Sequence, residues 1–224
     1  MIKIENTEVY GWETAIRGLR NPMNSWSKSD SEWIEGFGYC VGKNDFELMK
    51  KLCKAGTDHR KFMRMINVTC DITAPLYWVA EHDTYKISTV RNSCSFMHKG
   101  VSKPFEINDF SVQDGDVYSL FNKVTPEIIG FADKGLLDKV AMWENIIETL
   151  NTLRDKYLET KDENIFQEIR QILPQGYNVR YTWQANYEVL ANIYKSRKYH
   201  RLPEWREFCK WIEKLPYSEL IVGE

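Results

Sequence analysis

Apolar and polar positions alternate regularly over residues 64–73, RMINVTCDIT. The apolar positions are Ile66, Val68, Cys70 and Ile72, and the positions between them are Asn67, Thr69, Asp71 and Thr73. A period of two predicts a strand with one buried face. The next residues, TAPLYWVAEHD, predict a short helix, because Thr73 can cap its start and Pro75 suits its first turn.

Helical spacing dominates the second half of the chain. Residues 133–159 place apolar side chains three to four positions apart with charges between them, which predicts a long amphipathic helix. Those apolar residues are Leu136, Val140, Trp143, Ile147, Leu150 and Tyr157. Residues 163–174 predict another helix, ended by Pro174, and residues 202–216 predict a last one. In the first half, residues 44–56 predict a short helix that Asn44 caps and Gly56 follows.

Residues 173–197, LPQGYNVRYTWQANYEVLANIYKSR, raise a question about buried polar groups. Val179, Trp183, Leu190 and Ile193 recur at helical spacing, so we expect one long helix with an apolar stripe. Asn186 and Arg197 fall on the same stripe, and Asn192 lies one position off it. Because burying an amide or a guanidinium without partners costs several kcal/mol, they need either core partners or a bound polar ligand. The spacing leaves both explanations open.

The remaining segments complete an α+β pattern. Residues 1–11 predict a short first strand, residues 15–32 are polar and turn-rich, with Arg17 and Arg20 close together, and residues 102–127 resemble a loop. Strands therefore concentrate in the first half and long helices in the second, which favours a small antiparallel or mixed sheet packed with helices. The length of 224 residues suits a single domain over 1–224.

Composition narrows the class of protein. The net charge of −2 gives no basis for a surface that binds a nucleic-acid polymer. The five cysteines are odd in number and form no C-x-x-C pair, which argues against a zinc site or a disulfide framework and for a reducing compartment. The amino terminus has no apolar signal core, and no run of about 18 apolar residues predicts a membrane span. We therefore expect a cytoplasmic protein.

Residues 84–98, TYKISTVRNSCSFMH, form the second polar segment of interest. Their hydroxyl, amide, lysine and arginine side chains suit a phosphate group, although a solvated loop explains them equally well. His59 has either a structural or a ligand-stacking role, and His82 ends the short helix, where a histidine is favourable. The sequence contains no zinc-protease motif, P-loop, G-x-S-x-G or G-x-G-x-x-G. A dinucleotide here would need a site other than a Rossmann fold.

The order of these features resembles the flavin-dependent thymidylate synthases over roughly residues 44–212. In that family a histidine precedes a strand, an Ala-Pro helix leads into an Arg-His-Arg-x-x-Ser-x-Asn-Glu-x-Ser signature, and a Leu-Pro precedes a helix bearing Asn-x-Arg, Asn and Arg. Here Ala74-Pro75 and Leu173-Pro174 occupy the corresponding positions, with Arg170 also matching. The resemblance rests more on the order of elements than on identity.

The resemblance implies a set of site residues. Asn186 and Asn192 match the two asparagines that contact FAD, and Arg197 matches the arginine that contacts and activates the pyrimidine. His59 falls where the family has a histidine near the isoalloxazine ring. Glu81 and Thr89 stand where the family has a glutamine near the flavin and the first signature serine, so both are expected at the cofactor.

The signature loop departs from the family pattern. Thr84, Tyr85 and Lys86 replace Arg-His-Arg, and Glu188 replaces the arginine of Asn-x-Arg. We expect the phosphate of a pyrimidine nucleotide to be bound by a different set of donors, namely Lys86, Ser88, Arg91, Ser93 and Ser95, with Asn92 as a further substrate contact. The family's second serine becomes Cys94, and nothing in the sequence marks Cys94 as a nucleophile.

The family reaction implies the function. It is the reductive methylation of dUMP to dTMP, with methylenetetrahydrofolate and NADPH as co-substrates and FAD as cofactor, in a homotetramer with sites at its subunit interfaces. The altered loop leaves two alternatives, an enzyme that acts on another pyrimidine nucleotide and a nucleotide-binding homologue without catalysis. No metal is expected.

Overall fold

The computed structural model describes residues 2–96, 100–112 and 134–223. The chain divides into two compact units, each built from separate stretches of sequence. The first unit contains Thr73–Glu81 and Ser93–Arg180, and the second contains Ile2–Ile72, His82–Asn92 and Tyr181–Glu224. The expected loop over 102–127 lies outside the described residues from position 113 onward.

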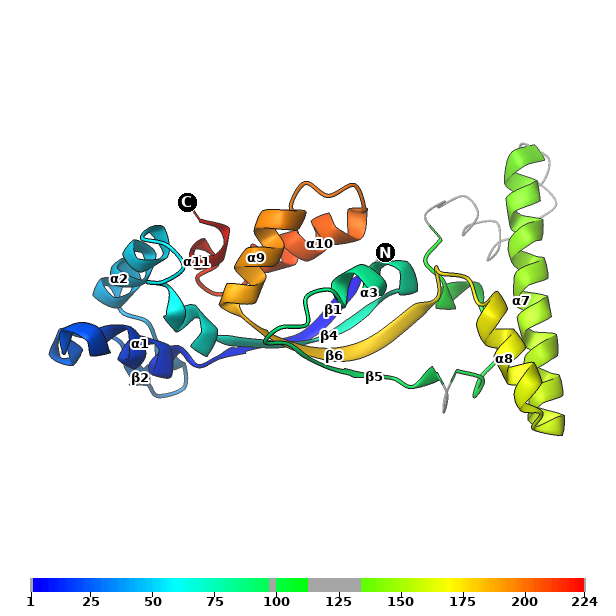
Figure 1. Ribbon diagram of the computed structural model, residues 1–224, viewed down its shortest axis with the longest axis horizontal. Coiled ribbons are helices and arrows are strands. Elements are labelled where there is room, and N and C mark those ends of the chain that lie inside the picture. Colours follow the sequence, from blue (N-terminus) through cyan, green and yellow to red (C-terminus); the bar gives the residue numbers. More distant parts are fainter. Residues whose placement is uncertain (1, 97–99, 113–133, 224) are drawn as a thin grey trace. The chain divides into compact units, whose positions relative to one another are not determined.

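In the described part of the chain, six strands form two sheets. The larger sheet has the hydrogen-bonded order β1-β4-β6-β5 (Figure 1). Its strands are β1 (Lys3–Tyr10), β4 (Asn67–Pro75), β5 (Val90–Ser93) and β6 (Asn178–Asn186). The smaller sheet is an antiparallel hairpin of β2 (Glu32–Ile34) and β3 (Gly38–Cys40), in which Trp33 pairs with Tyr39. The predicted first strand is confirmed as β1.

Strand β4 confirms the strand predicted from the alternation of residues 64–73. Val68, Cys70 and Ile72 are each at most 1% exposed, whereas the polar residues between them are half-buried. The predicted short helix follows as α3 (Leu76–His82). The predicted capping was wrong, because Thr73 and Pro75 belong to the strand, which extends to the start of the helix.

The long helix predicted over 173–197 was wrong for its first half. Residues 178–186 form strand β6, and only Tyr187–Arg197 are helical, as α9. Tyr181, Trp183 and Ala185 are buried while Thr182 is exposed, which is a period of two in a run of aromatic and β-branched residues. The four-residue interval between Val179 and Trp183 fits both periods. Strands are therefore not confined to the first half of the chain.

The segment predicted to be turn-rich over 15–32 begins as a helix instead. Helix α1 (Trp12–Arg20) buries Trp12, Ala15 and Ile16 at helical spacing and packs against the 3-10 helix η3 (Lys61–Met65). Gly11 precedes α1 at φ 98°, and a Cβ there would lie 2.1 Å from the carbonyl oxygen of Met65. Only glycine fits this position, because the backbone of η3 approaches so closely.

The other predicted helices are confirmed. They are α2 (Lys43–Lys54), α7 (Lys134–Thr160), α8 (Glu163–Ile172) and α10 (Pro203–Ile212), and a short α11 (Glu219–Val222) follows. Asn44 does not cap α2, since the carboxylate of Asp30 accepts from the backbone N–H groups of Asn44 and Asp45. The overall class is α+β, as the sequence predicts.

Each unit has its own packed interior. In the first unit α7 packs against α8 (Figure 1), and the core they share includes Leu150, Phe166 and Ile169. In the second unit α9 packs against α10, α11 and η3. Within the described parts of the chain, each helix is too short or too polar to cross a membrane.

A buried ion pair holds the amino-terminal part of the second unit together. Arg20 is 4% exposed and Asp45 is fully buried, and the two side chains are 2.6 Å apart. Arg20 also donates to the carbonyl oxygens of Ser25 and Lys28, at 3.1 and 3.0 Å. The second carboxylate oxygen of Asp45 accepts from the hydroxyls of Ser29 and Ser31, both at 2.6 Å. This one pair therefore fixes α1, α2 and the loop between them.

The hydrogen bonds of Asp45 determine its ionisation. Burial opposes the charged carboxylate, but the hydrogen bonds from Ser29, Ser31 and Arg20 outweigh it, so the pKa of Asp45 is lowered. A lowered pKa in the folded state stabilises the protein above the unfolded pKa, about 3.9, and the contribution is lost as the pH falls through the folded value.

We predict that Asp45→Asn lowers the free energy of unfolding at pH 7 by about 3–5 kcal/mol, because it leaves the Arg20 charge buried without a counter-ion. Urea denaturation measures this. Glu47→Gln is the matched control, since the exposed Lys50–Glu47 pair on the same helix should contribute under about 1 kcal/mol. Equal losses in the two variants would contradict a special role for the buried pair.

Candidate functional site

The junction of β6 and α9 places the first predicted ligand contact. Asn186 is the last residue of β6 and the N-cap of α9, and its Oδ1 accepts from the N–H of Val189 at 3.0 Å. The next residue, Tyr187, donates its backbone N–H to the carbonyl of Ile66 at 3.0 Å. Asn186 is 6% exposed, and its Nδ2 donates to no group among the described residues. The oxygen of this amide therefore serves the helix, and the nitrogen remains for another partner.

A cavity of about 450 Å³ lies between the start of α9 and the loop of residues 84–88. Four of the predicted site residues line it, namely Lys86, Ser88, Asn186 and Asn192. The other lining residues are Arg64, Thr84, Tyr85, Ile87, Glu188 and Val189. Asn192 is exposed and stands six residues after Asn186 on the same helix. The structure therefore gathers residues that the sequence separates by about a hundred positions.

Glu188 contributes a carboxylate whose charge is compensated within the chain. It is 7% exposed, and its Oε1 accepts from the Nε and Nη2 of Arg60 at 3.3 and 3.1 Å. Its Oε2 is buried without a hydrogen-bond partner among the described residues. Removing Arg60 would leave the carboxylate uncompensated, so the two residues form one unit of the site.

The loop of residues 84–89 is held in shape by its own hydrogen bonds. The hydroxyl of Thr89 donates to the carbonyls of Tyr85 and Lys86, at 2.9 and 3.2 Å. Ser88 has φ 61°, a conformation that is uncommon for residues other than glycine. Lys86 and Ile87 are exposed on this loop, with Ile87 at 87% exposure. The loop presents one cation and one apolar side chain at the cavity mouth.

A second cavity of about 190 Å³ shares Lys86 and Tyr85 with the first. Its other lining residues are His82, Asp83, Thr89, Arg91 and Trp183. The predicted phosphate ligand Arg91 donates to Asp83 at 2.5 Å, and its guanidinium lies 5.2 Å from the ring centre of Tyr181. Asp83 therefore already neutralises part of the charge that a phosphate would use.

His82 remains neutral in this second cavity. It is 2% exposed among the rings of Trp183, Trp205 and Phe208, and its Nδ1 lies 3.1 Å from the hydroxyl of Tyr181. Burial, helped by the charge of Arg91, lowers the pKa of His82 to about 3. A histidine that stays uncharged near neutral pH is unsuited to general acid–base catalysis there.

Arg197, in the last turn of α9, is joined to the loop of residues 84–89. Its Nε donates to the hydroxyl of Tyr85 at 2.9 Å, and its guanidinium lies 4.7 Å from the ring centre of Trp205. Arg197 is half-buried and lines neither of the two cavities. Tyr85, to which Arg197 donates, lines both cavities.

The remaining predicted residues are not among those that line these two cavities. In the second unit, His59 is exposed in the turn after α2, Asn92 is exposed in β5, and neither lines these two cavities. Glu81, Ser93 and Ser95 belong to the first unit. Ser95 and Cys94 line a third cavity there, of about 150 Å³.

Sequence reasoning missed several residues of the two main cavities. Arg64 gave no signal beyond its place as the first residue of a predicted strand. Glu188 was noticed only as a departure from the family pattern, and its partner Arg60 is 128 residues away in sequence. Tyr85 and His82 carry contacts that depend on packing between segments distant in sequence, which no local pattern reports.

Comparisons with known proteins show the fold. No protein-family model matches the sequence, and a search of curated proteins finds no match. Among solved structures, thymidylate synthase X from Helicobacter pylori, described with FAD and dUMP, has a TM-score of 0.66 at 15% identity, covering 100% of this chain and 98% of that one. A second structure of the same enzyme, also complexed with FAD and dUMP, has a TM-score of 0.67 at 16% identity over 99% and 98% of the chains.

A further similar structure is the UMP/dUMP methylase PolB from Streptomyces cacaoi, bound with 5-Br dUMP. Its TM-score is 0.59 at 14% identity, and the match covers 97% of this chain and 93% of that one. The likeness extends over almost the whole length of each chain. The structure therefore confirms the fold that the order of sequence elements implied, and the chain has the fold of the flavin-dependent thymidylate synthases.

Proposed function

We propose that this protein is a flavin-dependent enzyme that methylates a pyrimidine nucleotide, with dUMP as substrate and dTMP as product. The observation that carries the proposal is the gathering of Asn186, Asn192, Lys86 and Ser88 around one cavity of about 450 Å³. The family resemblance assigns the two asparagines to FAD and the loop to the nucleotide. Solved structures with the same fold are described with FAD and dUMP, which supports the assignment.

The cavity has the chemistry that a flavin requires. Its volume falls in the range of small-molecule sites, and Ile87, Val189 and Tyr85 provide apolar surface for a flat ring system. The Nδ2 of Asn186 and the amide of Asn192 are suited to the polar edge of that ring. When bound, FAD would supply the redox chemistry, with NADPH as reductant and methylenetetrahydrofolate as donor of the one-carbon unit.

The charges of the site suit an anionic ligand. Arg64 and Lys86 line the main cavity as cations, whereas the carboxylate of Glu188 is engaged by Arg60. A nucleotide phosphate placed near Lys86 would gain charge-assisted hydrogen bonds. Lys binds a phosphate as a point charge rather than as a planar fork, so salt should weaken this contact.

We assign Arg197 to the pyrimidine base. Its guanidinium is always charged, and the hydrogen bond to Tyr85 together with the ring of Trp205 restricts its orientation. Such a fixed cation stabilises negative charge that develops on a base carbonyl. In the proposed reaction Arg197, which borders the cavities through its bond to Tyr85, acts as the electrostatic catalyst, and Tyr85 positions it.

A second candidate substrate is UMP. The methylase PolB, which has the same fold, is described as acting on both UMP and dUMP. A loop with Thr84, Tyr85 and Lys86 in place of Arg-His-Arg also permits a different choice of nucleotide.

For the assembly we propose the homotetramer that the family resemblance implies, and light scattering would report about four times the chain mass of 26.5 kDa.

We expect purified protein, supplied with FAD, NADPH and methylenetetrahydrofolate, to convert dUMP to dTMP. Chromatographic detection of the product tests this, with UMP assayed in parallel. If product formed only from UMP, the substrate would be UMP rather than dUMP. A yellow protein that binds dUMP without forming product would indicate a homologue that has lost catalysis.

The flavin assignment predicts different outcomes for two substitutions at Asn186. Asn186→Asp keeps a side-chain oxygen to cap α9 but loses the Nδ2 donor, so it should weaken FAD binding with little change in stability. Asn186→Ala should in addition lower the free energy of unfolding by about 1 kcal/mol through the lost cap. Flavin fluorescence titration and urea denaturation measure the two effects.

Asn192→Ala should likewise weaken FAD binding, without a change in apoprotein stability, because Asn192 is exposed. Asn44→Ala, at an exposed asparagine on α2, is the matched control and should change neither property. Unaltered FAD affinity in both Asn186→Asp and Asn192→Ala would show that the amides serve only the fold.

The nucleotide assignment predicts opposite effects for two charge changes in the loop. Lys86→Ala should weaken dUMP and UMP binding to a similar degree, by about 1–3 kcal/mol for a lost charged hydrogen bond. Asp83→Asn should tighten both, because it frees Arg91 from its internal partner. Calorimetric titration measures the affinities. Unchanged affinities for dUMP and UMP in both variants would show that the phosphate binds elsewhere.

A further inference from the structure

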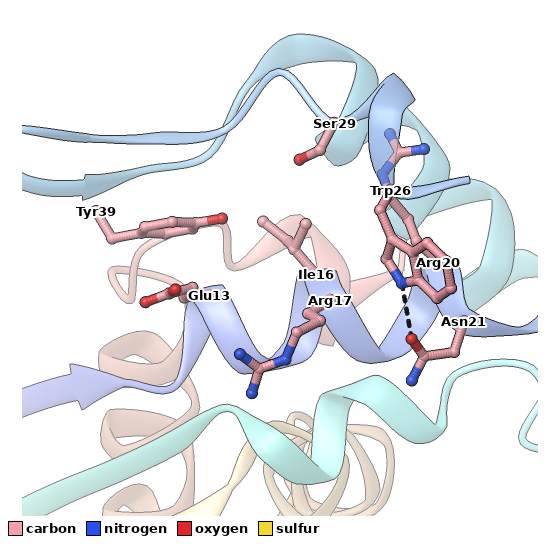
Figure 2. Close-up of a pocket in the computed structure, with 8 residues that line it drawn as sticks. All are labelled: Glu13, Ile16, Arg17, Arg20, Asn21, Trp26, Ser29 and Tyr39. Carbon is pink, nitrogen blue, oxygen red and sulfur yellow. Dashed lines mark hydrogen bonds between the residues drawn. The ribbon is translucent and has the colours of Figure 1, made fainter. Parts of the chain in front are cut away.

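A separate cavity of about 390 Å³ lies in the amino-terminal part of the second unit, and it shares no lining residue with the cavities of the proposed active site. Helix α1 forms its floor through Ile16, which is 2% exposed. The phenol of Tyr39 and the indole of Trp26 provide aromatic walls, and Figure 2 shows Ile16 between these two rings. The volume suits a small molecule with one or two fused rings.

The aromatic walls are held in place before any ligand binds. The Nε1 of Trp26 donates to the Oδ1 of Asn21 at 2.8 Å, drawn as a dashed line in Figure 2, while half of the indole surface stays exposed. Tyr39 packs edge-on against Trp33, with ring centres 5.7 Å apart. The buried Arg20, tied to Asp45, fixes the loop that carries Trp26. Such a prearranged site loses little entropy when a ligand binds.

Arg17 lines this cavity as a cation without an ion-pair partner in the part of the chain that the structure describes. Glu13 and Arg17 both line it and are four residues apart on α1, the spacing at which helical side chains form ion pairs. They form none, because Glu13 accepts instead from the Nε1 of Trp33 at 3.0 Å. Among the described residues, no carboxylate lies within salt-bridge distance of Arg17. The exposed guanidinium is therefore available to an anionic group.

We propose that this cavity is a second ligand site, which binds a planar aromatic molecule carrying a carboxylate or similar anionic group. The ring lies against Ile16 between Trp26 and Tyr39, and the anion pairs with Arg17. Burial raises the pKa of Tyr39, while a side-chain hydrogen bond with Ser31 opposes the rise. The site lies apart from the proposed flavin and nucleotide cavity and does not depend on that function.

Three ligands with one ring system and different charges test the proposal. Indole-3-acetate is an anion, tryptamine is a cation and indole is neutral, and calorimetric titration measures the affinity of the intact protein for each. We expect indole-3-acetate to bind roughly tenfold more tightly than the other two, the effect of about one charge-assisted hydrogen bond. Equal affinities, a preference for tryptamine, or no binding of indole-3-acetate at millimolar concentration would overturn the proposal.

Substitutions then locate the binding. Arg17→Gln should abolish the preference for the anion while leaving the thermal midpoint unchanged, because Arg17 is exposed. Arg201→Gln removes another exposed arginine, outside the described cavities, and should have no effect. Trp26→Leu should weaken all three ligands. A preference that persists in Arg17→Gln but disappears in Lys86→Ala would place the ligand in the other cavity and refute this site.

Discussion

The proposed active site depends on one hydrogen-bonded junction, where strand β6 ends and helix α9 begins at Asn186. The side-chain oxygen of Asn186 caps the helix, and the backbone of Tyr187 is tied to Ile66 beside strand β4. Together these bonds fix where the helix starts and which residues face the cavity. Glu188, Asn192 and the more distant Arg197 all follow from that starting point, because helix geometry sets their direction.

Charge compensation inside the chain decides what the cavities offer to a ligand. Glu188 is paired with Arg60 and Arg91 with Asp83, so neither pair presents its full charge. Lys86 lines both neighbouring cavities of the proposed site. At the aromatic cavity the opposite occurs, since Glu13 accepts a hydrogen bond from Trp33 and Arg17 has no ion-pair partner within the described ranges. Whether a cation is paired with a carboxylate of the chain therefore distinguishes a structural ion pair from a cation that can bind a ligand.

The fold of the flavin-dependent thymidylate synthases is present at about 15% identity with altered residues in the signature loop. A fold can persist at low sequence identity because a core tolerates exchanges that keep volume and pattern. The loop of residues 84–89 holds its backbone through the two hydrogen bonds of Thr89, which do not involve the side chains of Thr84, Tyr85 and Lys86. Fold and binding chemistry are thus specified by different residues.

The sequence by itself determined those elements in which the spacing of apolar residues fits only a helix or only a strand. Strand β4 and helix α7 follow from spacing, helices α2, α8 and α10 follow from spacing together with their end signals, and the α+β class follows from the elements together. Residues 178–186 were assigned to the wrong element, because Val179 and Trp183 fit a helix as well as a strand and only pairing in the sheet selects the strand. The residues of the proposed sites also divide into those that the sequence indicated and those that only the structure revealed. The order of motifs singled out Asn186, Asn192 and Lys86, whereas Arg60, Arg64 and the aromatic cavity around Arg17 emerged only from tertiary structure, because long-range packing decides which charges meet.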